Sequence, residues 1–340
     1  MNIQKEILKV TSEYFKDSID FLNLSNASKE YKNILNNLCE EDMDIQIGRK
    51  DIDSENGISL GTFWAALCLD DLIRTRNFIR GIDKAIKDKL QTKKNIHILY
   101  AGTGPFATLI LPLILKYSKE NIKYTFLEIN PFSFKLVQNV ISNLDLEKQN
   151  ISFVMADATK YKLDTNSKPD IIISETMQNA LAKEQQVPIF LNLMSQVNSN
   201  TIFIPEKIEI YIGFKEANIS MEEMELKHIH KEEKVLEIST ESIFKDNEIR
   251  KNDYNFSKKI TTIDSEKLKK YNQIGIFTEI QVYKNERINI SQSGLTTPMF
   301  INDIPDNFDG TLEISTQYKI SSDPKLDYEV TFKNLQEVNC

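Results

Sequence analysis

The stretch HILYAGTGPFATLI, residues 97–110, joins a run of apolar residues to a turn that contains two glycines. Such a run is typical of a buried strand. Gly102 and Gly104 leave the backbone bare, so a ligand can approach the turn closely, and Pro105 suits the first turn of a helix. The turn also matches G-x-G-x-x-A, which overlaps the fingerprint of dinucleotide-binding folds. We therefore predict a strand, a nucleotide-binding turn that includes Thr103, and a helix from Pro105.

The alternation of strand and helix continues downstream. Apolar runs such as NIHILYAG, KYTFLEI, ISFVMAD, DIIISE and TIFI are separated by helical patterns. This order predicts parallel βαβ units, and so a doubly wound, Rossmann-like α/β sheet across residues 91–205. Residues 1–90 carry apolar residues at helical spacing and are predicted to be helices. Residues 206–340 contain alternating segments such as GTLEISTQYKI, which predict an antiparallel, barrel-like β domain.

Two acidic residues stand at the ends of later strands of this sheet. Glu128 ends the run YTFLE, where its carboxylate could accept both hydroxyls of an adenosine ribose. Asp157 follows the next strand, where its carboxylate and the neighbouring backbone N–H of Ala158 could bind an adenine. Because the carboxyl ends of parallel strands meet at one edge, we expect these groups to lie beside the glycine turn. A ribose-binding carboxylate suits NAD and S-adenosylmethionine equally, so these residues alone leave both cofactors open.

The bulk composition argues against several classes of protein. The chain has 340 residues, 41% of them hydrophobic, and a formal net charge of −8 at pH 7. That length suffices for two domains, and the acidic balance argues against a nucleic-acid partner, which needs clustered Lys and Arg. Three scattered cysteines, Cys39, Cys68 and Cys340, are too few for a disulfide framework or a zinc site. No segment has the pattern of a signal peptide or the roughly 20 apolar residues of a membrane span, so we expect a cytoplasmic protein without a membrane partner.

The order of these motifs resembles that of class I S-adenosylmethionine-dependent methyltransferases, and further motifs resemble one family among them, the protein arginine methyltransferases. The stretch LDDLIRT, residues 69–75, is similar to the family's D-x-x-R-T helix. The resemblance implies S-adenosylmethionine as the cofactor, with Arg74 paired to the carboxylate of its methionine group. A guanidinium can bind a carboxylate through two parallel hydrogen bonds, which suits that role.

The stretch SETMQNALAKE, residues 174–184, resembles the family's double-glutamate loop, S-E-W-M-G-Y-x-L-x-Y-E. The resemblance implies catalytic roles for Glu175 and Glu184, which would hold a guanidinium by charge-assisted hydrogen bonds. On one continuous helix, nine residues at about 100° each would put the two side chains on opposite faces. The pair can therefore grip one ligand only if the segment folds back as a loop. The alternative is a strand-end Glu175 and a solvated Glu184.

The chain departs from the family's pattern around the methyl acceptor. Thr176, Asn179 and Lys183 stand where the family's loop has a tryptophan and tyrosines, and a lysine beside Glu184 would compete for that carboxylate. The family's Thr-His-Trp loop corresponds to SGLTTPMF, residues 293–300, which has neither His nor Trp. We therefore expect the acceptor to be a free guanidino or amino compound, or a dedicated peptide, at least as much as an arginine in a protein tail.

These features predict an S-adenosylmethionine-dependent N-methyltransferase that acts on a guanidino or similar cationic nitrogen. A second hypothesis is a methyltransferase of the same fold with a hydroxyl, carboxylate or amine acceptor and a glutamate as general base. Two further hypotheses are an NAD(P)-dependent oxidoreductase and a non-catalytic scaffold. No metal site is predicted, because the sequence offers no third ligand near His228 and His230. Members of the family commonly dimerise, so the resemblance is compatible with a homodimer, but the sequence shows no dimerisation arm between residues 215 and 275 and leaves the oligomeric state open.

Overall fold

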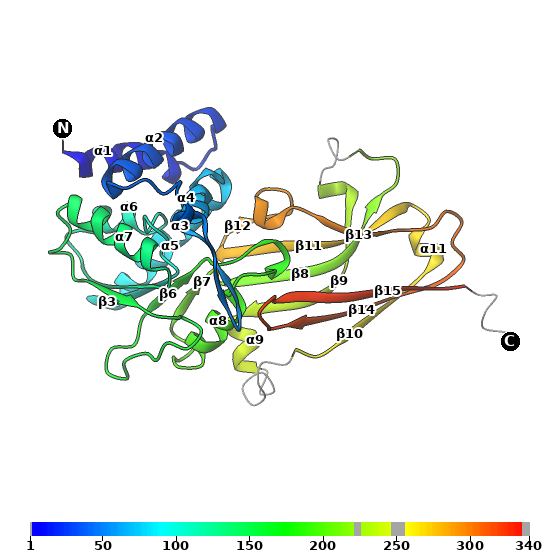
Figure 1. Ribbon diagram of the computed structural model, residues 1–340. Coiled ribbons are helices and arrows are strands. Elements are labelled where there is room, and N and C mark those ends of the chain that lie inside the picture. Colours follow the sequence, from blue (N-terminus) through cyan, green and yellow to red (C-terminus); the bar gives the residue numbers. More distant parts are fainter. Residues whose placement is uncertain (1, 221–225, 246–255, 335–340) are drawn as a thin grey trace.

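The computed structural model describes residues 2–220, 226–245 and 256–334 of the chain (Figure 1). In Figure 1 the N-terminal helices and a parallel sheet lie at one end of the molecule, and antiparallel strands extend to the other end. Cys39 and Cys68 carry free thiols, and Cys340 lies outside the described residues. Within the described ranges, no helix combines the length and the apolar content that crossing a membrane requires.

The parallel sheet has five strands in the order β5-β4-β3-β6-β7, and every neighbouring pair runs parallel. The chain winds outward from β3 first in one direction and then in the other, which is the predicted doubly wound arrangement. Ligands bind at the carboxyl edge of such a sheet where the order reverses, here between β3 and β6. The strands are β3 (Asn95–Ala101), β4 (Asn121–Glu128), β5 (Ile151–Met155), β6 (Ile171–Ser174) and β7 (Ile202–Ile204), and the helices between them are α6 (Leu111–Lys116), α7 (Pro131–Asn143) and α8 (Gln186–Met194).

The predicted helix from Pro105 is wrong, because α6 begins only at Leu111. Gly102, Gly104 and Ala107 have φ values of 76°, 59° and 48°. A residue in this left-handed region cannot continue a right-handed helix, so the chain makes separate turns before α6. The two glycines therefore serve a turn with left-handed backbone rather than the approach to a helix N-terminus.

The N-terminal segment is mostly helical, as its apolar spacing predicts, but it also contains a short hairpin. The antiparallel strands β1 (Ile52–Ser54) and β2 (Gly57–Ser59) form this hairpin where the sequence has a polar break. Helix α1 contacts α6 and helix α2 contacts α7, so these helices pack on the unit that contains the parallel sheet. The helices are α1 (Ile3–Thr11), α2 (Phe21–Cys39), α3 (Gln46–Arg49), α4 (Thr62–Leu67) and α5 (Leu72–Thr92).

The C-terminal strands form two antiparallel sheets, with orders β12-β11-β8-β9 and β10-β14-β15, and β13 pairs with β11. The predicted antiparallel domain is confirmed, but no hydrogen-bonded ladder joins the two sheets among the described residues, so a closed barrel is not seen there. Closure requires a matched tilt and stagger of all strands, which the alternation of single segments does not encode. The strands are β8 (Lys207–Glu216), β9 (Ile229–Ser239), β10 (Lys259–Asp264), β11 (Tyr271–Tyr283), β12 (Glu286–Ile288), β13 (Met299–Asp303), β14 (Gly310–Lys319) and β15 (Lys325–Asn334).

The antiparallel strands lie close to the carboxyl edge of the parallel sheet. Strand β8 starts at Lys207, soon after β7 ends and directly after Pro205 and Glu206. Strands β11 and β15 both contact the short 3-10 turn Asn179–Leu181, which follows β6. The C-terminal strands therefore pack directly against the segment that carries the two candidate glutamates.

Candidate functional site

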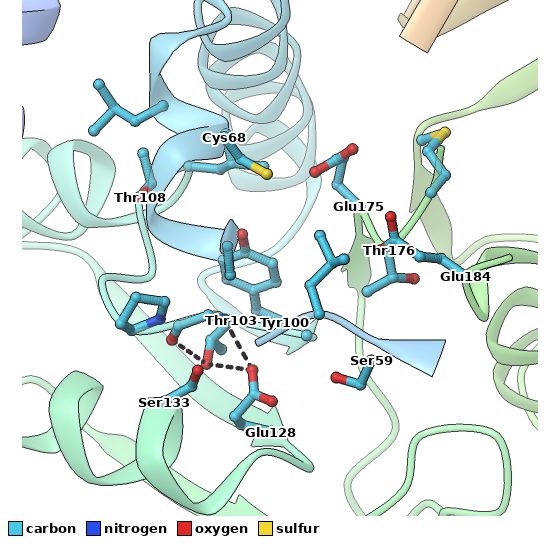
Figure 2. Close-up of a pocket in the computed structure, with 18 of the residues that line it drawn as sticks. Ser59, Cys68, Tyr100, Thr103, Thr108, Glu128, Ser133, Glu175, Thr176 and Glu184 are labelled. Carbon is cyan, nitrogen blue, oxygen red and sulfur yellow. Dashed lines mark hydrogen bonds between the residues drawn. The ribbon is translucent and has the colours of Figure 1, made fainter. Parts of the chain in front are cut away.

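One pocket at the carboxyl edge of the parallel sheet is lined by seven of the nine candidate residues (Figure 2). Figure 2 shows Thr103 and Glu128 at one end of this pocket, and Glu175 with Glu184 at the other. The described part of the chain holds no group of three or more His, Cys, Asp or Glu side chains arranged for a metal ion. The seven residues are Arg74, Gly102, Thr103, Gly104, Glu128, Glu175 and Glu184.

The carboxylate of Glu128 is held in place by backbone N–H groups. Its Oε2 accepts a hydrogen bond from Gly104 N (2.8 Å), and its Oε1 accepts one from Asn130 N (2.8 Å). Burial raises the pKa of Glu128, although these backbone hydrogen bonds oppose the shift. Thr103 Oγ1 also lies 3.5 Å from Oε2. This long contact is weak, so a ligand hydroxyl could take its place at the carboxylate.

Gly102 lets the double-glutamate loop (residues 174–184) lie against the glycine turn. A Cβ atom at Gly102 would clash with Cγ2 of Thr176, so any other residue would force the Thr176 side chain or the loop to shift. The positive φ of 76° at Gly102 also favours glycine. The small side chain at position 176 thus fits directly over the turn, and the two halves of the pocket meet there.

Arg74 lies in the first turn of α5 and reaches the pocket. Asp71 caps this helix, because its Oδ1 accepts a hydrogen bond from Arg74 N (3.1 Å). Nη1 of Arg74 donates to the carbonyl oxygen of Cys68 (2.9 Å), and Nη2 forms an ion pair with Glu175. Nε is buried and has no partner. A guanidinium has five N–H donors, so Arg74 can bind one more acceptor group.

Asp157 and Ala158 lie outside the pocket that the other candidates line. Oδ1 of Asp157 accepts hydrogen bonds from Thr159 N (2.8 Å) and Thr159 Oγ1 (2.7 Å). The carbonyl oxygen of Ala158 accepts one from Asn192 Nδ2 (2.8 Å). These local bonds use Oδ1 of Asp157 and the carbonyl oxygen of Ala158, and not the backbone N–H of Ala158 that the sequence suggests for adenine binding. The adenine-binding role of the two residues stays a prediction.

The double-glutamate loop folds back on itself, which the two-glutamate hypothesis requires. Ala180, Leu181 and Lys183 have φ values of 55°, 57° and 64°, so no continuous helix can run from Glu175 to Glu184. Only the short turn Asn179–Leu181 is helical in this loop. As a result both carboxylates line the same pocket.

The two carboxylates belong to buried residues. The Glu175 side chain is 2% exposed, and its Oε1 is buried without a partner. Burial raises the pKa of Glu184 to about 7, although the charge of Arg74 and a hydrogen bond with Gln178 oppose the shift, and the charge of Asp51 adds to it. Two buried acids with unused acceptor capacity suit a cationic ligand that donates several hydrogen bonds.

Lys183 does not enter the pocket. Lys183 is exposed, whereas Glu184 is buried. No ion pair between the two side chains is found among the described residues. Its backbone N donates to the carbonyl oxygen of Pro324 (2.7 Å), and its carbonyl oxygen accepts from Ile58 N (2.9 Å). The predicted competition between this lysine and the acceptor has therefore no support in the geometry.

The hairpin β1–β2 forms one wall of the pocket. The helical spacing of residues 1–90 did not predict this hairpin. Ile58 and Ser59 line the pocket, and Gln185 Nε2 donates to Ser54 Oγ (2.5 Å). The tip of the hairpin reaches the loop after β5, where Asn56 Nδ2 donates to Thr159 Oγ1 (3.3 Å). Figure 1 shows this hairpin in blue, reaching down from the N-terminal helices. The turn-forming residues SENG, 54–57, were the available signal.

The loop that replaces the family's Thr-His-Trp motif packs against both the α5 helix and the double-glutamate loop. Oδ2 of Asp71 accepts hydrogen bonds from Ser293 Oγ (2.6 Å) and Gly294 N (3.0 Å). The side chain of Asn179 donates to the carbonyl oxygen of Thr297. Residues 293–297 therefore occupy a position next to the pocket, although they carry neither a histidine nor a tryptophan.

Two solved structures are similar to this chain over most of its length. The Trypanosoma brucei PRMT1 enzyme-prozyme heterotetrameric complex with AdoHcy superposes with a TM-score of 0.54 at 12% identity, covering 79% of this chain and 93% of that one. Protein arginine methyltransferase 10 of Arabidopsis thaliana, in an open conformation, superposes with a TM-score of 0.53 at 13% identity, covering 78% and 91%. No protein-family model and no functionally curated protein matches the sequence. The chain therefore has the fold of the protein arginine methyltransferases, at an identity that leaves the substrate open.

Proposed function

We propose that this protein is an S-adenosylmethionine-dependent methyltransferase that acts on a guanidino or similar cationic nitrogen. The main support is the convergence of Arg74, the glycine turn, Glu128, Glu175 and Glu184 on one pocket. This pocket lies at the carboxyl edge of the sheet where the strand order reverses, which is the usual ligand site of such sheets. The protein arginine methyltransferase fold supports the same function.

The residues of the pocket fit the parts of this cofactor. Arg74 has a buried Nε without a partner and can receive the methionine carboxylate. Glu128 could accept ribose hydroxyls in place of its long contact with Thr103 Oγ1 (3.5 Å), and the backbone of Gly104 lies beside it. The Trypanosoma brucei PRMT1 complex contains AdoHcy, which has the same amino-acid carboxylate and ribose hydroxyls as S-adenosylmethionine. S-adenosylmethionine supplies an electrophilic methyl group when bound.

The acceptor end of the pocket favours a planar cation. Glu175 and Glu184 offer carboxylate oxygens from the two ends of one folded loop, and Glu175 Oε1 has no partner. A guanidinium presents N–H donors in a fork that matches carboxylates. Two carboxylates can thus orient it and draw its positive charge toward the nitrogens they contact, which leaves the remaining nitrogen more nucleophilic.

A second candidate function is methyl transfer to a hydroxyl, carboxylate or neutral amine with Glu184 as general base. The observation that favours it is the pKa of Glu184, which burial raises to about 7. A general base is most effective when its pKa lies near the working pH. Glu184 would take up the proton that a hydroxyl or amine acceptor loses, whereas a carboxylate acceptor has no proton to lose. Glu175 stays paired with Arg74.

Methyl transfer from isotopically labelled S-adenosylmethionine distinguishes the two candidates. The acceptor panel contains arginine, other guanidino compounds, basic peptides, primary amines, phenols and carboxylic acids, each with wild type and with Glu184→Gln. The proposal expects label on a guanidino or other cationic nitrogen, and a loss of about 100-fold in Glu184→Gln. Label on oxygen nucleophiles supports the second candidate. Absence of label on all acceptors contradicts both.

We also propose that the chain forms a homodimer, because one of the similar structures is a multimeric complex, described as heterotetrameric. The measurement is light scattering after size-exclusion chromatography of the full chain. A mass near twice 39.3 kDa supports the proposal, and a mass near 39.3 kDa at high concentration contradicts it.

A further inference from the structure

The double-glutamate loop is held by hydroxyl groups from two different C-terminal sheets. Thr278, on β11, donates through Oγ1 to Asn179 Oδ1 (3.2 Å). Thr278 Oγ1 also accepts a hydrogen bond from Ala180 N (3.3 Å). Tyr318, on β14, donates through Oη to the carbonyl oxygen of Leu181 (2.7 Å). These bonds fall between the two glutamates, at the point where the loop reverses.

The loop needs such support because its backbone is strained. Ala180, Leu181 and Lys183 all have φ values between 55° and 64°. Residues with a Cβ atom rarely adopt this region, because Cβ crowds the backbone carbonyl. Strained backbone of this kind persists only where the surrounding structure fixes it by several contacts, and it is frequent at functional sites.

We propose that Tyr318 and Thr278 are positioning residues that set the distance and orientation between Glu175 and Glu184. This inference rests on the proposed acceptor role of the two glutamates. Neither Tyr318 nor Thr278 lines the pocket, so each acts through the loop and not on the acceptor itself. Both are buried, at 2% exposure each, so their hydrogen bonds to the loop satisfy hydroxyls that lie away from the protein surface.

The two supports are rigid because each stands within a paired strand. Thr278 pairs with Ile210 of β8, and Tyr318 pairs with Leu326 of β15. The Tyr318 ring also packs edge-on against Phe256, with ring centroids 5.4 Å apart. The C-terminal strands thus support the double-glutamate loop, and the parallel-sheet unit alone does not contain these two hydroxyl groups.

Two variants remove one hydroxyl each and leave the side-chain volume nearly unchanged: Tyr318→Phe and Thr278→Val. Matched controls lose a comparable buried hydrogen bond away from the pocket. Tyr283→Phe removes the bond from Tyr283 Oη to Asp88 Oδ2 (2.8 Å), and Thr201→Val removes the bond from Thr201 Oγ1 to the carbonyl oxygen of Pro169 (3.0 Å). The controls allow a general loss of stability to be subtracted.

The first readout is hydrogen–deuterium exchange of peptides that cover residues 176–185 in the full chain, without ligands. Both test variants are expected to exchange roughly five- to tenfold faster in this segment, and both controls are expected to match wild type there. Equal exchange in test and control variants would overturn the inference, whatever the enzyme does.

The second readout is kinetic and uses the best acceptor of the wild-type panel. The test variants should raise KM for the acceptor by roughly tenfold, while the Kd for S-adenosylhomocysteine stays within about twofold of wild type. Faster exchange with unchanged acceptor KM would also overturn the inference. If wild type methylates no acceptor, the proposed function fails, and the exchange experiment still decides whether Tyr318 and Thr278 hold the loop.

Discussion

The guanidinium of Arg74 forms an ion pair with the carboxylate of Glu175, and both residues line the pocket. Their side chains are 10% and 2% exposed. The pair joins the residue proposed to hold the cofactor's carboxylate to the first of the two glutamates proposed to hold the acceptor. Removing one member of such a buried pair typically costs about 3–5 kcal/mol, because the other charge is left without compensation. The charge of Arg74 at the proposed cofactor site is therefore compensated by Glu175 at the proposed acceptor site.

Replacing Glu175 with Gln is expected to separate cofactor binding from methyl transfer. The change frees Arg74 from a competing carboxylate, so the Kd for S-adenosylhomocysteine should stay equal or become lower. Methyl transfer should fall by roughly 100-fold, because the acceptor loses a charge-assisted hydrogen bond. The measurements are calorimetry with S-adenosylhomocysteine and initial rates with labelled cofactor. The matched control is Glu286→Gln, a buried glutamate paired with Arg80. Equal rates in Glu175→Gln and wild type would contradict the acceptor role.

Replacing Arg74 with Lys is expected to weaken cofactor binding. Lysine keeps the charge but cannot form two parallel hydrogen bonds with a carboxylate, so the Kd for S-adenosylhomocysteine should rise about 10- to 100-fold. Arg80→Lys on the same helix serves as control, because Arg80 pairs with Asp17 (3.1 Å) and Glu286 (3.0 Å) and does not line the pocket. Equal affinities in the two variants would rule out the carboxylate-binding role of Arg74.

Glu184 is expected to make both stability and activity depend on pH. Its pKa in the folded protein is about 7, above the ordinary value of 4.5. Between these values the folded protein keeps a proton that the unfolded chain has lost. The stabilisation from Glu184 is therefore complete below pH 4.5 and disappears as pH rises through about 7, a difference on the order of 3 kcal/mol. Arg74 and Gln178 act against this shift and Asp51 acts with it.

Unfolding by urea at pH 5 and pH 8 checks the stability effect, with Glu184→Gln as the reference. The difference between the two pH values should be smaller in Glu184→Gln than in wild type. Methyl transfer should rise with pH through about 7, because a cationic acceptor needs the ionised carboxylate. A wild-type rate that is flat from pH 6 to pH 8 would show that Glu184 does not titrate at the acceptor site.

Lys183 is expected to matter for backbone strain and not for the acceptor. Lys183→Ala removes the charge and keeps the left-handed conformation, so methyl transfer should stay within about twofold of wild type. Lys183→Gly relieves a φ of 64° and should raise the free energy of unfolding by about 1 kcal/mol. Lys148→Gly is the control, because Lys148 is exposed and does not have a positive φ. A destabilised Lys183→Gly would show that this position carries no strain that glycine can relieve.

The parallel sheet could be predicted from the sequence because its strands are buried and form nearly continuous apolar runs. Residues Ile171 to Ile173 of β6, for example, are fully buried. The start of α6 could not be predicted, because it depends on the backbone of Ala107. This buried residue has a left-handed conformation, which delays the helix, and an alanine in the sequence gives no sign of it. The division of the C-terminal strands into two separate sheets depends on long-range pairing, which the period of single strands does not contain.

The candidate residues near the glycine turn could be named from strand ends alone, because the topology gathers those ends at one edge. The fold-back of the double-glutamate loop could not be predicted from local sequence. It depends on Thr278 and Tyr318, which lie 99 residues from Asn179 and 137 residues from Leu181 along the chain. The adenine-binding role of Asp157 stays a prediction. Its carboxylate accepts two bonds from Thr159, a local interaction that competes with a ligand.

The proposed cofactor site is best tested by calorimetric titration of the wild-type chain with S-adenosylhomocysteine and with NADH. We predict one site per chain for S-adenosylhomocysteine and no heat of binding for NADH, with an affinity for S-adenosylhomocysteine at least roughly tenfold lower in Glu128→Gln. Binding of NADH without binding of S-adenosylhomocysteine would contradict the assignment of this protein as an S-adenosylmethionine-dependent methyltransferase.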